Sequence, residues 1–140
     1  MSEPPADAPA DRMVLDASAL LAWLRAEPGA DVVEPHLAGA AISTVSWSEV
    51  GQKLAQHGVD AARTLHQVRV LGVIVEPFTL DDAATAAAFW EPGREAGLSL
   101  GDRCCLALAA RLDRPALTAD AAWTRIGDIA AFGVPIHLIR

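Results

Sequence analysis

Short apolar segments alternate with longer helical segments along most of this chain, and this alternation restricts the fold more than any other feature. The segments with strand character are 13–15, 40–43, 73–75, 116–118 and 134–139. The segments with helical spacing or helix-capping residues are 18–25, 32–37, 44–57, 60–71, 79–91, 99–112 and 121–126. Buried strands of a parallel sheet are nearly continuous apolar runs, and the helices between them cover both faces. The order predicts an α/β fold of three layers, α/β/α, around a mainly parallel sheet of four to five short strands.

Length and composition indicate one domain. The chain has 140 residues, of which 52% are hydrophobic and 21% charged, and this apolar content excludes disorder for most of it. Residues 1–12 differ, because they are rich in proline, alanine and acids and show no periodicity. We expect them to form a disordered leader before a single domain at 13–140, with Met13 as an alternative translation start.

The charge balance excludes a basic arm that binds nucleic acid. The chain has 11 Lys+Arg against 18 Asp+Glu, a net charge of −7, and no block of basic residues. If it handles nucleic acid, something other than net charge must neutralise the phosphates. There is neither a secretory signal nor an apolar run long enough for a membrane span. Cys104 and Cys105 are adjacent, so they support neither a disulfide framework nor a zinc site, and we expect a cytoplasmic protein.

Four acidic residues occupy comparable positions in the expected topology. Asp16 follows the first strand, Asp120 follows the fourth, Glu49 lies on the helix after the second, and Asp102 lies in the first turn of the helix before the fourth. In an open α/β sheet, the carboxyl ends of strands and the adjoining helix N-termini share the edge where ligands bind. The topology therefore predicts that these acids face one cleft.

Carboxylates gathered in one cleft repel each other, so either their pKa values rise or a cation binds them. Oxygen ligands without a Cys or His partner suit Mg²⁺ or Mn²⁺ rather than zinc. Such ions clamp a phosphodiester and activate a water molecule, and in two-metal sites they lie about 3.5–4 Å apart. They would also place positive charge where this acidic chain lacks it.

Each acid also has a purely structural interpretation. Asp16 could cap the following helix, and Glu49 could pair with Lys53 one turn later. Asp102 could interact favourably with the positive N-terminal end of its helix dipole, and Asp120 could form an Asx turn. The metal-site hypothesis rests on the recurrence of all four positions rather than on any one acid.

Four segments and the C-terminus resemble the motifs of PIN-domain ribonucleases. They are VLDASALLA at 14–22, ISTVSWSEV at 42–50, LSLGDRCCLALA at 98–109, LTADAAW at 117–123 and the ending GVPIHLIR at 133–140. Their order and spacing agree from Met13 to the C-terminus. Within that family, the chain is most similar to VapC-type toxins of bacterial type II toxin–antitoxin pairs.

The resemblance implies a PIN-like fold and a Mg²⁺- or Mn²⁺-dependent endoribonuclease that cleaves RNA. It also implies inhibition by a cognate antitoxin protein, and a homodimer. The motif matches carry the catalytic and metal-binding roles to Asp16, Glu49, Asp102 and Asp120. Hydroxyls that support them fall on two further residues, Ser18 and Thr118. Ser46 stands where an asparagine is common in the family, so one supporting contact differs.

Two other functions are weighed against the ribonuclease. A non-catalytic PIN-like module would bind RNA or protein, but such a module has no need to concentrate like charges. An aspartate-nucleophile phosphatase would want a second acid two residues after Asp16, where Ser18 stands. Arg103 could contact phosphate, but we expect it to be a surface arginine on a helix. We expect Trp123 to brace the site and the other tryptophans to lie in the core or an interface.

Overall fold

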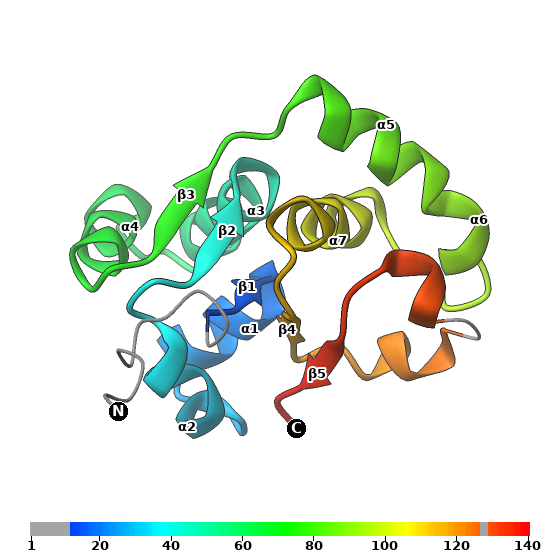
Figure 1. Ribbon diagram of the computed structural model, residues 1–140. Coiled ribbons are helices and arrows are strands. Elements are labelled where there is room, and N and C mark those ends of the chain that lie inside the picture. Colours follow the sequence, from blue (N-terminus) through cyan, green and yellow to red (C-terminus); the bar gives the residue numbers. More distant parts are fainter. Residues whose placement is uncertain (1–11, 127–128) are drawn as a thin grey trace, which may run out of the picture.

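The chain folds around a five-stranded parallel sheet, which confirms the predicted α/β class. The computed structural model describes residues 12–126 and 129–140 (Figure 1). The strands are β1 (Val14–Leu15), β2 (Ala41–Ser43), β3 (Ile74–Glu76), β4 (Ala116–Thr118) and β5 (Ile136–Leu138). Their order is β3-β2-β1-β4-β5, and every neighbouring pair is parallel. The expected leader at 1–12 lies outside the described residues except for its last position.

Helices connect the strands as the alternation predicted. They are α1 (Ala17–Leu24), α2 (Ala30–Val33), η2 (Glu34–His36), α3 (Thr44–Gln56), α4 (Ala61–Val70), α5 (Leu80–Ala88), α6 (Trp90–Gly93), α7 (Leu100–Leu112), η3 (Ala121–Arg125) and η4 (Ile129–Phe132). The single helix expected at 32–37 is wrong, because the segment divides into α2 and the 3₁₀ turn η2 that contains Pro35. Within the described ranges, no helix is both long and apolar enough to cross a bilayer.

Alternating side chains of the short strands build a separate core on each face of the sheet. Val14, Ala41 and Ala116 pack with α5 and α7 on one face. Their successors in each strand, which include Leu15 and Leu117, pack with α1, α3 and α4 on the other. Successive strand residues point to opposite faces, so even two or three apolar residues serve both cores. This accounts for the three layers (Figure 1).

The strand order places a topological switch point at β1. From β1 the chain builds the sheet outward through β2 and β3, and it returns to the other side of β1 with β4 and β5. Ligands of open α/β sheets bind at the carboxyl ends of the strands where the order reverses. Asp16 follows β1 directly, and Asp120 lies two residues beyond β4, so both acids flank this point.

Two capping boxes start the helices α5 and α7. The Thr79 hydroxyl accepts a hydrogen bond from the backbone of Asp82, whose carboxylate accepts one from Thr79. Ser99 and Asp102 repeat the arrangement in α7. Each box satisfies two backbone N–H groups that a helix start leaves free.

The first of these acids also joins the two helices. The Asp82 side chain is 3% exposed and binds Arg111 of α7 through two nitrogens, Nε at 2.9 Å and Nη2 at 3.2 Å. Arg111 also donates to the carbonyl of Pro77, 3.2 Å away. A two-point Arg–carboxylate bond fixes orientation as well as distance, and here it fastens α5 to α7.

One prediction about an individual side chain is wrong. Arg103 is not a free surface arginine, because its Nη1 donates to the carbonyl of Ala86 at 2.7 Å and its Nε is buried. Trp90 is 50% exposed, which excludes the core and leaves the alternative of an interface, and the Arg94 guanidinium lies 5.4 Å from its ring. Cys104 and Cys105 are both buried, and burial raises the pKa of both thiols.

Asp82→Asn should lower the free energy of unfolding by about 2 kcal/mol, because the buried partner of Arg111 loses its charge. Urea denaturation at neutral pH measures the change. Asp81→Asn is the matched control, since Asp81 is the neighbouring acid in the first turn of α5 but is exposed. Equal losses in the two variants would contradict the structural role of the Asp82–Arg111 bond.

Candidate active site

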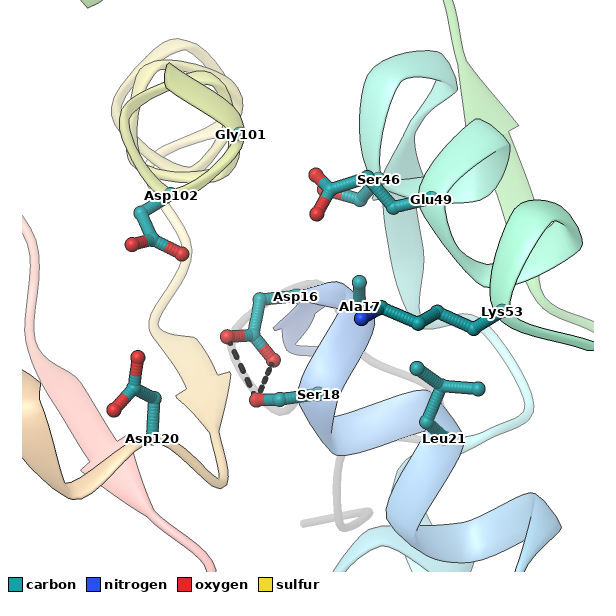
Figure 2. A pocket seen from close by; sticks show the side chains of 10 residues that line it. All are labelled: Asp16, Ala17, Ser18, Leu21, Ser46, Glu49, Lys53, Gly101, Asp102 and Asp120. Atoms are coloured by element: carbon teal, nitrogen blue, oxygen red, sulfur yellow. Dashed lines mark hydrogen bonds between the residues drawn. The ribbon is translucent and has the colours of Figure 1, made fainter. Parts of the chain in front are cut away.

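The four acids singled out from the sequence line one pocket at the carboxyl edge of the sheet. The pocket has a volume of about 150 Å³ and lies between α1, α3 and the start of α7 (Figure 2). Its lining consists of Asp16, Ala17, Ser18, Leu21, Ser46, Glu49, Lys53, Gly101, Asp102 and Asp120. The structure thus brings together the residues that topology expected at one edge. Their roles in metal binding and catalysis remain predictions.

Asp16 is the most deeply placed of these acids, with 4% of its surface exposed. It is the N-cap of α1, and its Oδ1 accepts a hydrogen bond of 2.8 Å from the backbone of Ala19. Ser18 donates to the same carboxylate at 2.7 Å, and Thr118 donates to Oδ2 at 2.5 Å. A carboxylate offers about four lone-pair positions. Three donors therefore hold Asp16 in place and leave room for one more contact.

The hydroxyls of Ser18 and Thr118 connect β4 to this carboxylate. Ser18 Oγ accepts from the backbone of Ala119 at 2.9 Å, and Thr118 Oγ1 accepts from the backbone of Asp120 at 3.0 Å. Each of the two hydroxyls donates its single proton to Asp16. Its lone pairs therefore remain free to accept hydrogen bonds from backbone N–H groups. Both residues expected to support the acids therefore contact Asp16, although only Ser18 lines the pocket.

Glu49 reaches the pocket because α7 has a glycine where α3 approaches it. A Cβ atom at Gly101 would overlap Oε1 of Glu49 and lie 2.9 Å from its Cδ. Glu49 lies in the middle of α3, whose N-cap is Ser43, so its carboxylate takes no part in capping that helix. The local sequence therefore leaves the Glu49 carboxylate free to face the other acids, as Figure 2 shows.

Asp102 and Asp120 each accept a hydrogen bond from a backbone N–H group through one carboxylate oxygen. Asp102 Oδ2 accepts from the backbone of Ser99 at 2.9 Å, and Asp120 Oδ1 accepts from Ala122 at 2.9 Å. The second oxygen of each carboxylate has no hydrogen bond within the described residues, so it is available to a ligand in the pocket. The structural roles considered for these acids are therefore real, and they occupy only half of each carboxylate.

Trp123 lies in η3, the 3₁₀ helix that Asp120 caps. It is 2% exposed, and among the described residues its buried indole Nε1 has no hydrogen-bond partner. The indole N–H lies near Asp102 and acts to lower the pKa of that carboxyl. This is the position expected of a residue that braces the site.

Burial raises the pKa of three of the acids. Asp16 rises to about 6, because the removal of water outweighs its three hydrogen bonds, and the charge of Asp102 adds to the effect. Burial also raises the pKa of Glu49, with a further contribution from Asp102, while Lys53 opposes it. For Asp102 the raising causes are burial and the charge of Asp120. The pocket therefore holds unsatisfied negative charge.

The donor set fits a hard divalent cation. The pocket offers carboxylate and hydroxyl oxygens and no Cys or His, the ligand chemistry of Mg²⁺ or Mn²⁺. In the part of the chain that the structure describes, no three acidic, His or Cys side chains converge closely enough to enclose an ion. A cation would therefore draw the free oxygens of Asp102, Asp120 and Glu49 toward Asp16.

Lys53 is the charged residue of this pocket that the sequence did not assign to the site. It is the chain's one lysine among ten arginines, and it lies four residues after Glu49 on α3. In the sequence, that spacing indicates only a helix ion pair with Glu49. The sequence signal that could have placed Lys53 in the pocket is its position one turn beyond Glu49, on the same face of the same helix.

A comparison with protein-family models matches residues 13–129 to the PIN domain. The chain belongs to the PIN-domain family. The match includes all four acids of the pocket and confirms the family resemblance. No curated protein sequence matches this PIN domain.

Solved structures with the same fold come from toxin–antitoxin complexes. A toxin–antitoxin complex from Klebsiella pneumoniae has a chain that is 19% identical, with a TM-score of 0.71, and the alignment covers 91% of this PIN domain and 98% of that chain. A DNA-bound VapBC from Salmonella typhimurium is 14% identical, with a TM-score of 0.65 and coverages of 92% and 98%. VapBC2 from Rickettsia felis, bound to a promoter DNA fragment, is 11% identical, with a TM-score of 0.65 and coverages of 90% and 97%. At these identities the likeness establishes the fold.

Asp16→Asn should make the PIN domain more stable at neutral pH when EDTA is present. The folded-state pKa of about 6 lies above the ordinary value of 3.8, so the folded state binds more protons between these limits. The free energy of unfolding of the wild type therefore falls by about 2–3 kcal/mol as the pH rises from 3.8 to 6. The variant does not lose this stability, because asparagine does not ionise. Unfolding in urea across pH 3.5–7.5 measures it; parallel curves for the two proteins would refute it.

Gly101→Ala should weaken Mn²⁺ binding several-fold without destabilising the fold. The added methyl displaces the Glu49 carboxylate, while alanine favours a helix over glycine by up to about 1 kcal/mol. Calorimetric titration with Mn²⁺ and urea denaturation give the two readings. Gly51→Ala is the control, because Gly51 also lies in a helix but does not line the pocket. Unchanged Mn²⁺ affinity in Gly101→Ala would contradict the assignment of Glu49.

Proposed function

We propose that this PIN domain is a Mg²⁺- or Mn²⁺-dependent endoribonuclease and the toxin of a toxin–antitoxin pair. The observation that carries the proposal is the single pocket lined by Asp16, Glu49, Asp102 and Asp120 at the switch point of the sheet. Membership of the PIN-domain family and the fold shared with toxin–antitoxin complexes support it.

The surroundings of each acid indicate the role that it would have in binding a cation. Asp16, held by three donors, would be the fixed ligand of a bound cation. Asp102 and Asp120 each contribute the oxygen that their capping role leaves free, and Glu49 approaches from α3. A bound Mg²⁺ or Mn²⁺ supplies an activated water molecule and neutralises charge on the phosphodiester.

The raised pKa values support this assignment. Three carboxyls with raised pKa values face one another in the pocket, and a cation would relieve both their burial and their mutual repulsion. A non-catalytic binding module gains nothing from this arrangement, which favours the ribonuclease over that alternative.

The partners follow from the same proposal. The substrate is RNA, and the inhibitor is a small cognate antitoxin, since the similar folds belong to complexes described as toxin–antitoxin and VapBC. We further propose a homodimer that acts in the cytoplasm.

Asp102→Asn should abolish cleavage of total cellular RNA while the protein stays folded. Asparagine keeps the oxygen that accepts from Ser99, so the start of α7 survives, but the pocket loses a negative ligand. Cleavage is measured on purified protein with Mn²⁺, with Mg²⁺ and with EDTA. Discrete fragments should appear with either metal, disappear with EDTA and fall at least about 100-fold in the variant.

Asp82→Asn is the matched control, because Asp82 holds the same position in the other capping box and does not line the pocket. It should lose stability and, well below its melting temperature, keep cleaving RNA. Asp102→Asn should keep its stability and lose RNA cleavage. A folded Asp102→Asn protein that cuts RNA at the wild-type rate would overturn the proposed function.

A further inference from the structure

We propose that Lys53, Arg25 and His57 form a basic track that leads out of the acidic pocket, and that the Lys53 and Arg25 cations of this track bind successive phosphates of a single RNA strand. The inference rests on the proposed ribonuclease activity and deepens it, because it says along which helices the substrate lies. The track runs between the C-terminal halves of α1 and α3.

Lys53 forms the end of the track inside the pocket. Among the residues that line the pocket it is the one with a permanent positive charge, and Figure 2 shows its side chain extended from α3 toward the acids. It forms no ion pair with Glu49 or any other described carboxylate. Its ammonium group is therefore available to an anion beside the candidate metal ligands.

Arg25 and His57 continue the track by one helical turn. Leu21 and Lys53 line the pocket from α1 and α3, and Arg25 and His57 each follow one of them by four residues. Residues four apart lie on the same face of a helix, one turn of about 5.4 Å further along. The two helices pack against each other, and Arg25 Nη2 lies 3.4 Å from His57 Nδ1. The three basic side chains are therefore neighbours.

The hydrogen bonds leave the charged groups of Lys53 and Arg25 available to a ligand. His57 Nδ1 lies 2.8 Å from the carbonyl oxygen of Lys53, which only accepts, so Nδ1 carries a proton and donates it there. Nδ1 then has no lone pair for Arg25, whose guanidinium makes no ion pair with a described acid. Arg25, Lys53 and His57 are all exposed.

Other arginines near the site are already committed to structural roles. Arg103, although adjacent to Asp102, donates to the carbonyl of Ala86 in α5. Arg111 is held by Asp82 and Pro77. Lys53 is the basic residue among those that line the pocket, and Arg25 and His57 lie one helical turn further along the same helices. An acidic chain with a net charge of −7 therefore has a local means of holding phosphate.

The test is binding of a fluorescein-labelled 12-nucleotide single-stranded RNA of mixed sequence, followed by anisotropy from 50 to 300 mM KCl. All proteins carry Asp102→Asn, which prevents cleavage. Removing one basic group that binds a phosphate of a single strand reduces the slope of log K against log salt by about 0.7. Lys53→Met and Arg25→Met should each show this reduction and bind several-fold more weakly at 50 mM, and Lys53→Arg should restore binding.

Arg94→Met is the matched control, because it removes the same charge from an exposed arginine outside the pocket and the track. It should leave the slope unchanged. Slopes in Lys53→Met and Arg25→Met that equal the parent slope would overturn the track while leaving the ribonuclease intact. Protein without the Asp102 substitution that neither binds nor cuts RNA would overturn both. If Lys53→Met and Arg25→Met keep the parent slope for RNA but bind a poly-glutamate peptide more weakly than the parent, the surface would instead bind an acidic protein partner.

Discussion

The buried carboxylate of Asp16 is the contact on which the architecture of the site depends. It caps α1 through Ala19, and through two hydroxyls it is joined to the chain that leaves β4. One side chain thus fixes the angle at which a helix leaves the central strand and the position of the neighbouring strand's end. These bonds do not fully offset the cost of burial, which shows in the raised pKa of Asp16. A group retained at such a cost is better explained by a ligand than by folding alone.

Much of this arrangement could be predicted from the sequence, because it follows from topology. Strands that are buried on both faces show as apolar runs, and the polar residue that ends each run lies at a known edge of the sheet. Asp16 and Asp120 can be placed in this way. The approach of Glu49 to α7 cannot, since it depends on Gly101 lacking a side chain at the point where two helices meet. Nothing in the local pattern of either helix records that meeting.

The two capping boxes show most clearly where local reasoning ends. Thr79–Asp82 and Ser99–Asp102 have the same spacing, chemistry and hydrogen bonds. One acid is buried against Arg111 and fastens two helices, and the other lines the pocket. The difference arises from what lies opposite each helix start, a tertiary fact. The same reason accounts for Arg103, whose neighbour in α5 is remote in the sequence.

The order of the strands also governs when the pocket comes into being. Thr118 and Asp16 are 102 residues apart in the sequence, and β1 pairs with β4 as well as with β2. During synthesis the N-terminal part of a chain emerges first. A nascent chain that has produced α1 and α3 still lacks α7 and β4, so Asp16 is without the Thr118 hydroxyl and the carboxylates of Asp102 and Asp120. The pocket is therefore assembled only when translation is nearly complete, and a ribosome carrying an unfinished copy does not carry a finished site.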